Sequence, residues 1–157
     1  MDLFDIKAQA ISPAYALLPA RMESDAATVL LLAIGLQESR FEHRRQIGGP
    51  ARGFWQFERG GGVAGVLRHP VSRAEALKVC DARGVSPVPE QVYWKLEFDD
   101  VLAAAFARLL LFTDPAPLPA ICECDKAWDY YLRTWRPGKP HRRTWDELYA
   151  RAMESIA

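Results

Sequence analysis

The chain has 157 residues, of which half are apolar and a quarter are charged, and its 20 lysines and arginines balance its 20 aspartates and glutamates. This length and composition are typical of a single globular domain with a sizeable core. The neutral balance argues against binding to nucleic acid or an anionic membrane through overall charge. Two segments, 43–46 and 136–143, are locally basic. Each is either a solvated loop or part of a groove for an anionic polymer.

The N-terminal residues lack the basic and apolar regions of a signal peptide, and the apolar run near residue 30 is too short to span a bilayer. We therefore expect a protein made in the cytoplasm, with no membrane insertion. The cysteines, Cys80, Cys122 and Cys124, are too few for a disulfide framework. With no histidine near Cys122 and Cys124, they predict buried or half-buried free thiols rather than a zinc site. No metal or other cofactor is expected.

Helical signals dominate the sequence in chain order. Ser24 is placed to cap a helix, Ser72 and Thr144 each begin a capping box, and Gly84 is placed to end a helix. The expected helices cover residues 12–21, 25–40, 63–68, 72–84, 90–112, 118–135 and 144–155, with an irregular stretch at 43–53. No stretch shows the alternation of a strand, so we expect one all-α domain over residues 1–157.

Glu38 stands at the end of an unusually apolar helix. Leu31 and Ile34 precede it by seven and four residues, which places all three on one helical face. Burial and the negative end of the helix dipole both disfavour the charged carboxylate, so its pKa should be raised. A carboxylic acid that stays protonated near neutral pH can donate a proton to a leaving group. The alternative is a surface glutamate paired with Arg40 or Arg44.

Two spaced segments resemble the signature of the lytic transglycosylase family and its goose-type lysozyme relatives. The family has a Glu-Ser pair with a phenylalanine soon after, then a loop, and then Gly-Ala-x-Gly-Leu-Met-Gln. Here Glu38-Ser39 is followed by Phe41, and residues 51–56 read ARGFWQ, with phenylalanine for leucine and tryptophan for methionine. The separation between Glu38 and Gln56 also agrees with the family's usual spacing.

A third element of the family, Ala-Tyr-Asn-Ala-Gly, lies late in the chain. The corresponding region here is 134–138, TWRPG, with Trp135 in the place of the tyrosine and Arg136 in the place of the asparagine. In the family that tyrosine helps to hold the catalytic glutamate. Tyr130 or Tyr131, one turn earlier, is the candidate for that role in this chain.

The resemblance implies a lysozyme-like helical domain with a substrate cleft, and peptidoglycan glycan strands as the substrate. The cleaved bond would be the β-1,4 link between N-acetylmuramic acid and N-acetylglucosamine. Glu38 would act first as the acid and then as the base, and Glu58, the nearest other acid, is expected to be structural or at the surface. Aromatic rings and polar side chains suit a sugar cleft. The candidate substrate-binding residues are Ser39, Trp55, Gln56, Tyr130, Tyr131 and Trp135.

Other functions remain open from the sequence. One is a hydrolytic lysozyme, and another is a non-catalytic structural or peptidoglycan-docking protein of the same fold. A helical module that binds nucleic acid or protein finds its only support in the basic segment 136–143. A wall-directed motif without a signal peptide is typical of a bacteriophage endolysin or virion component, which reaches the wall through a holin or an injection apparatus. A bacterial enzyme with another export route is the remaining source.

Overall fold

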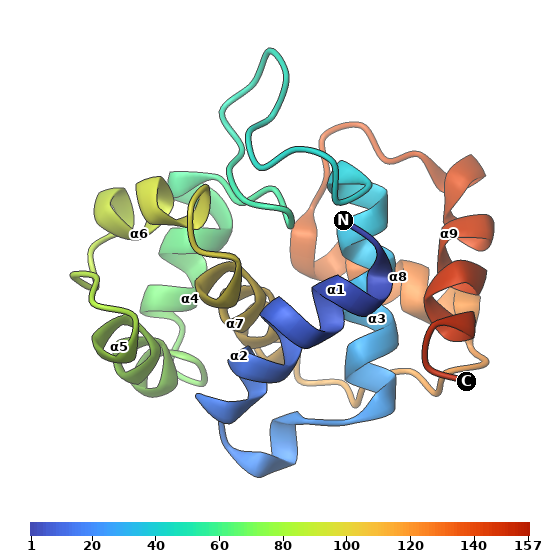
Figure 1. Cartoon of the computed structure of the whole chain (residues 1–157), viewed down its shortest axis with the longest axis horizontal. Helices are drawn as coiled ribbons and strands as arrows, with labels where there is room; N and C mark the ends of the chain where they lie inside the picture. The colour runs from blue at the N-terminus through green and yellow to red at the C-terminus, as the bar shows by residue number, and fades with distance from the viewer.

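The computed structural model describes all 157 residues and consists of helices joined by turns and loops (Figure 1). The all-α prediction is confirmed, because the β pairing is limited to two isolated bridges, Arg45 with Arg52 and Arg52 with Phe57. The α-helices are α1 (Leu3–Ile6), α2 (Ser12–Ala16), α3 (Asp25–Ser39), α4 (Ala64–Arg68), α5 (Arg73–Ala82), α6 (Pro89–Leu96), α7 (Asp100–Phe112), α8 (Cys124–Trp135) and α9 (Arg142–Glu154). Shorter helical turns are η1 (Lys7–Ile11), η2 (Ala20–Met22) and η3 (Arg59–Val63). None of these helices combines the length and the apolar character needed to cross a membrane.

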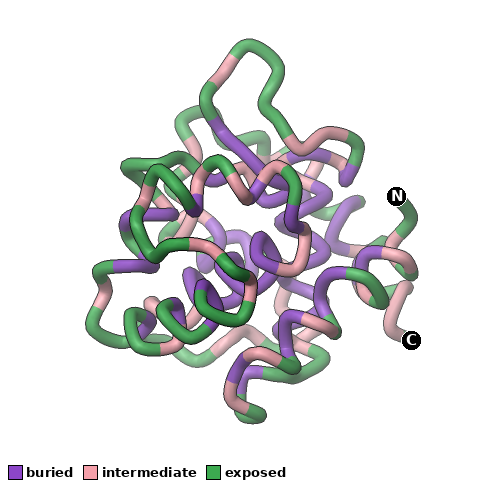
Figure 2. The backbone as a smooth tube through the Cα atoms, turned by 60° about the vertical axis from the view of Figure 1, so that its left-hand side comes forward, coloured by how far each residue is buried: buried purple, intermediate pink, exposed green.

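Helix α3 runs through the centre of the domain and is buried on every side from Ala27 to Leu36. Its N-terminus is capped as predicted, since the Ser24 hydroxyl accepts a hydrogen bond from the Ala27 backbone N–H at 3.0 Å. The helix packs against α7 and α9. Figure 2 shows the buried interior around this packing and the mostly exposed loop that follows α3. The apolar run in the sequence is therefore the core of one domain.

Two boundaries differ from the sequence prediction because local capping was missed. The first helical segment begins at Leu3 rather than Ser12, since the Asp2 side chain accepts a hydrogen bond from the Asp5 N–H and starts α1. The expected single helix 90–112 is broken into α6 and α7. Asp99 causes this break, because its carboxylate accepts the Leu102 N–H at 3.0 Å and so caps α7.

Neither predicted capping box forms. The Ser72 hydroxyl donates instead to the Val66 carbonyl at 2.7 Å, and α5 begins beside it without a side-chain cap. Thr144 lies inside α9, where its hydroxyl bonds the side-chain oxygen of Gln37 at 3.1 Å. Helix α8 begins at Cys124 rather than Leu118, after the proline-containing segment that follows α7. The hydroxyls predicted as caps therefore serve contacts between elements.

Candidate active site

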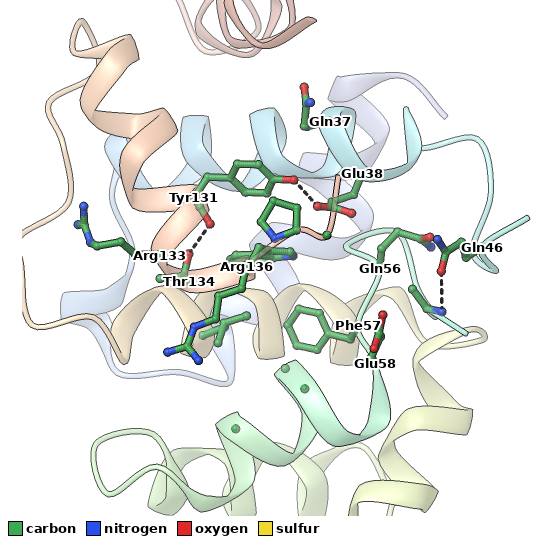
Figure 3. A pocket seen from close by; sticks show the side chains of 18 of the residues that line it. Gln37, Glu38, Gln46, Gln56, Phe57, Glu58, Tyr131, Arg133, Thr134 and Arg136 are labelled. Carbon is green, nitrogen blue, oxygen red and sulfur yellow. Dashed lines mark hydrogen bonds between the residues drawn. The ribbon is translucent and has the colours of Figure 1, made fainter. Parts of the chain in front are cut away.

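A cleft of about 1160 Å³ contains most of the residues that the sequence singled out. One side, the α3–α8 wall, is formed by the ends of α3 and α8 and the loop 136–141 (Figure 3). The other side, the glycine wall, is the segment from Glu58 to Gly65, and Leu110 and Thr113 of α7 lie between the two. Most of the lining residues are polar or glycine, so the cleft suits a ligand rich in hydroxyl and amide groups.

Glu38 is the penultimate residue of α3, and its partly buried side chain lines the cleft. Burial raises the pKa of its carboxyl from 4.5 to about 7, and a hydrogen bond from Tyr131 opposes this shift. The predicted rise is thus supported, with burial as the main cause. A carboxyl with this pKa is populated in both protonation states near neutral pH, as an acid–base catalyst requires.

Tyr131 of α8 is the tyrosine that holds Glu38. Its hydroxyl donates to Oε1 of Glu38 at 2.5 Å (Figure 3). Its ring stacks on Trp145 of α9 with centroids 5.3 Å apart and an angle of 10° between planes. Burial and the neighbouring Glu38 raise the pKa of Tyr131 far above its usual range, so it stays a hydrogen-bond donor. The sequence had left Tyr130 and Tyr131 as alternatives, and the geometry selects Tyr131.

Tyr130 does not line the cleft, which corrects its prediction as a substrate-binding residue. Its side chain is buried and its hydroxyl donates to the Leu111 carbonyl at 2.7 Å. Adjacent residues of a helix point about 100° apart, so only one of the two tyrosines can face Glu38. The core position of Tyr130 follows from that constraint.

The chain reverses directly after Glu38, and Ser39 and Phe41 hold this reversal. The Ser39 hydroxyl donates to the Phe54 carbonyl at 2.7 Å and accepts the Phe41 N–H at 3.1 Å. The Phe41 ring packs against Gly35, where a Cβ would lie only 2.0 Å from Cζ of the ring. Ser39 is therefore buried and structural, which corrects its assignment as a substrate-binding residue. The glycine inside an otherwise apolar helix was the sequence signal for this contact, and it was not used.

The segment 53–57 brings Gln56 to the cleft and buries Trp55. Gly53 has φ of +74°, and a Cβ there would lie 3.1 Å from the Leu96 carbonyl oxygen, so the absence of a side chain allows a close approach of the backbone. Trp55 is buried with its indole N–H donating to the Leu31 carbonyl at 2.8 Å, so its ring is part of the core and cannot stack on a sugar. Gln56 lines the cleft, and its amide donates to the Gly53 carbonyl at 2.9 Å.

Trp135, at the end of α8, lines the cleft, and its role in substrate binding stays a prediction. Its indole N–H donates to the Trp55 carbonyl at 2.9 Å, and its ring meets Phe57 edge-on with centroids 5.7 Å apart. This residue ties α8 to the segment that carries Gln56. It therefore combines a packing role with a ring at the cleft surface.

Two further carboxylates line the cleft. Asp114 is ion-paired with Arg133 at 3.0 Å, which holds the pKa of Asp114 below its usual range. Glu58 is exposed on the glycine wall, as the surface prediction had it. The expected partners of a surface Glu38 lie elsewhere, because Arg40 bonds backbone carbonyls of α3 and Arg44 pairs with Asp100. Glu38 thus differs from Asp114 in having no cationic partner and from Glu58 in being partly buried.

The cysteines and possible metal ligands lie outside this arrangement. Cys80 is buried, Cys124 is half-buried and donates to the Asp146 carboxylate at 3.3 Å, and all three thiols are free. Cys122 is exposed, which corrects its prediction as a buried or half-buried thiol. No group of three or more histidine, cysteine, aspartate or glutamate side chains could hold a metal ion.

Comparison with known proteins adds no relative. No protein-family model, no curated protein and no solved structure matches the chain. The function is therefore argued from the cleft and from the resemblance carried by residues 38–56.

Proposed function

We propose that this protein degrades peptidoglycan, by cleaving the β-1,4 bond between N-acetylmuramic acid and N-acetylglucosamine. The observation that carries the proposal is the Glu38 carboxyl, whose pKa lies at about 7 inside a large polar cleft. The hydroxyl of Tyr131 fixes the orientation of this carboxyl toward the cleft. The resemblance supplies the substrate and a lysozyme-like fold, which remain part of the proposal.

The proposed reaction uses Glu38 twice. In the first step the protonated carboxyl gives its proton to the glycosidic oxygen while the bond from C1 of N-acetylmuramic acid breaks. In the second step the resulting carboxylate takes the proton of the same sugar's 6-hydroxyl, whose oxygen bonds to C1 and closes a 1,6-anhydro ring. Glu38 ends the cycle protonated, so no water is consumed. Tyr131 can keep its hydrogen bond to Glu38 in both charge states, because a phenol donates to either form of the carboxyl.

We favour a lytic transglycosylase over a hydrolase because, of the two other carboxylates in the cleft, one is ion-paired and the other is exposed. Hydrolysis requires another carboxylate, either as nucleophile or to activate a water. Asp114 is held by Arg133, and Glu58 is exposed on the glycine wall. The position of Glu58 in the same cleft is the observation that keeps a hydrolytic lysozyme as the second candidate.

Mass spectrometry of digested sacculi tests the proposal. Purified peptidoglycan is incubated with the protein, and the released muropeptides are analysed before and after borohydride reduction. Anhydro ends that resist reduction are the expected result. Reducing ends would assign the hydrolytic alternative, and intact sacculi would leave a non-catalytic docking or structural role as the better explanation.

A further inference from the structure

The loop that follows α8 carries two cationic side chains into the cleft. Arg136 and Lys139 both line it, and neither side chain takes part in an ion pair of the chain. The neighbouring cation, Arg133, is neutralised by Asp114 at 3.0 Å. Both unpaired cations are exposed, so they are free to meet a ligand in the cleft.

Arg136 occupies a backbone conformation that suits other residues better. It caps α8 with φ of +49° and ψ of 54°, in the left-handed region that glycine and asparagine adopt at lower cost. Strained residues of this kind gather where function requires a particular side chain. Pro137 fixes φ directly after Arg136 and Pro140 fixes φ directly after Lys139, with Gly138 between them.

The arrangement leaves these cations available for a ligand rather than for Glu38. Figure 3 shows the Arg136 side chain extending away from the Glu38 carboxyl. Across the cleft, a Cβ added at Gly60 or Gly65 would meet nothing within 4 Å. A strand bound between the two walls therefore has room for its substituents. The unpaired cations Arg136 and Lys139 lie on the α3–α8 wall, and the glycine wall opposite carries the Glu58 carboxylate.

We propose that Arg136 and Lys139 bind a carboxylate carried by the glycan strand, so that the cleft selects anionic strands over neutral ones. The inference rests on the proposed function and specifies the substrate of the same cleft. An arginine recognises a carboxylate through two parallel hydrogen bonds, and a lysine adds a point charge. Peptidoglycan offers this group in two places, the lactyl carboxylate of a peptide-free muramic acid and the carboxylates of a peptide stem.

A binding experiment with matched oligosaccharides tests the inference without turnover. The Glu38→Gln protein is titrated calorimetrically with strands of one length in three forms: with free lactyl carboxylates, with those carboxylates converted to methylamides, and with peptide stems. The same titrations are made with Arg136→Asn and Lys139→Gln added together, since asparagine tolerates the left-handed conformation. Arg143→Gln is the control, because Arg143 is an exposed, unpaired cation of α9 outside the cleft.

We expect the protein with both substitutions, Arg136→Asn and Lys139→Gln, to bind at least one carboxylate-bearing form about tenfold more weakly than the Glu38→Gln protein does. The methylamide form should bind equally well to both proteins. The form that loses affinity identifies the source of the carboxylate. Arg136→Lys should restore part of the loss, and Arg143→Gln should show none. Unchanged affinity, an equal loss for the methylamide form, or an equal loss in the control would overturn the inference.

Cleavage by the wild-type protein reports on the proposed function separately. Charge-dependent binding without cleavage of any strand would remove the proposed function and keep the carboxylate site. Cleavage of strands that bind independently of their charge would keep the proposed function and remove the carboxylate site. Failure to bind any of the three forms would overturn both.

Discussion

The two walls of the cleft are built in opposite ways. On the α3–α8 wall, the Glu38 carboxyl is held by Tyr131, whose ring stacks on Trp145. On the glycine wall, Gly60 and Gly65 leave open space where side chains would project. The α3–α8 wall is therefore closely packed around Glu38, whereas the glycine wall is open at Gly60 and Gly65.

This difference separates two requirements of a catalytic cleft. A carboxyl keeps a raised pKa only if the protein shields it from water, which demands close packing around it. A polymeric substrate needs room for its substituents, which demands few side chains. A glycan-cleaving site needs both properties, so substitutions on the two walls test the proposed function from opposite sides.

Replacing Glu38 with glutamine should have the largest effect. Glutamine keeps the shape and can still accept the Tyr131 hydrogen bond, but it has no proton to transfer. We expect release of soluble muropeptides to slow by about 10²–10⁴-fold, with an unchanged fold. Glu58→Gln, on the opposite wall, is the matched control and should stay within a few-fold of wild type. A normal rate in Glu38→Gln would exclude Glu38 from catalysis, and a large loss in Glu58→Gln would favour hydrolysis.

The same Glu38→Gln variant should reveal the energetic cost of the buried carboxyl. Because the folded-state pKa of Glu38 is raised from 4.5 to about 7, the folded protein binds this proton more tightly than the unfolded chain. The stability contributed by the proton is complete below pH 4.5 and is lost as the pH rises through 7, by up to about 3 kcal/mol. Urea denaturation below pH 4.5 and above pH 7 measures this loss. The free energy of unfolding of the variant, relative to that of wild type, should be higher at the higher pH. A difference independent of pH would contradict the burial of the carboxyl.

Gly35→Ala should destabilise the protein beneath the α3–α8 wall, because the added methyl group crowds the Phe41 ring. A Cβ at Gly35 would lie 2.0 Å from the buried Phe41 ring, so we expect the free energy of unfolding to fall by about 1–3 kcal/mol. Gly65→Ala makes the same change on the glycine wall, where nothing lies within 4 Å, and should be neutral or stabilising by up to about 1 kcal/mol. Thermal unfolding of both variants compares the walls directly. Equal melting temperatures would show that the Phe41 ring yields readily.

Gln56→Ala should lower stability only slightly. The Gly53 carbonyl that accepts the Gln56 amide also accepts the Gln56 backbone N–H, so no buried acceptor is left without a partner. We expect a loss below about 1 kcal/mol and a several-fold slower turnover, because the amide faces the cleft. Both are measured on one preparation by thermal unfolding and muropeptide release. A destabilised protein with normal specific activity would make Gln56 part of the scaffold.

The sequence predicted those features that depend on residues close together in the chain. The apolar run before Glu38 indicated a buried helix ending in a carboxyl, and Ser24 marked its start. The sequence could not show which tyrosine meets Glu38, because that choice depends on how α8 rotates against α3. Nor could it show that Trp55 is buried while Gln56, next to it, reaches the cleft.

Capping was harder to predict for a related reason. Ser72 and Thr144 each had a favourable local pattern, but their hydroxyls bond Val66 and Gln37 instead. A short hydroxyl can satisfy either its own helix or a neighbouring element, and tertiary packing decides between them. Asp99 was not predicted to cap a helix, because the apolar pattern continues on both sides of it.

The titration of the Glu38 carboxyl is the most direct test of the central claim. It is followed by NMR of protein labelled with ¹³C at the glutamate carboxyls, and the Glu38 signal is assigned from its loss in Glu38→Gln. We predict a pKa of about 7 in the wild-type protein. The pKa should be higher still in Tyr131→Phe, because the hydroxyl that lowers it is gone while the stacked ring remains. A Glu38 pKa close to 4.5 in the wild-type protein would contradict the claim that this carboxyl is a proton donor near neutral pH.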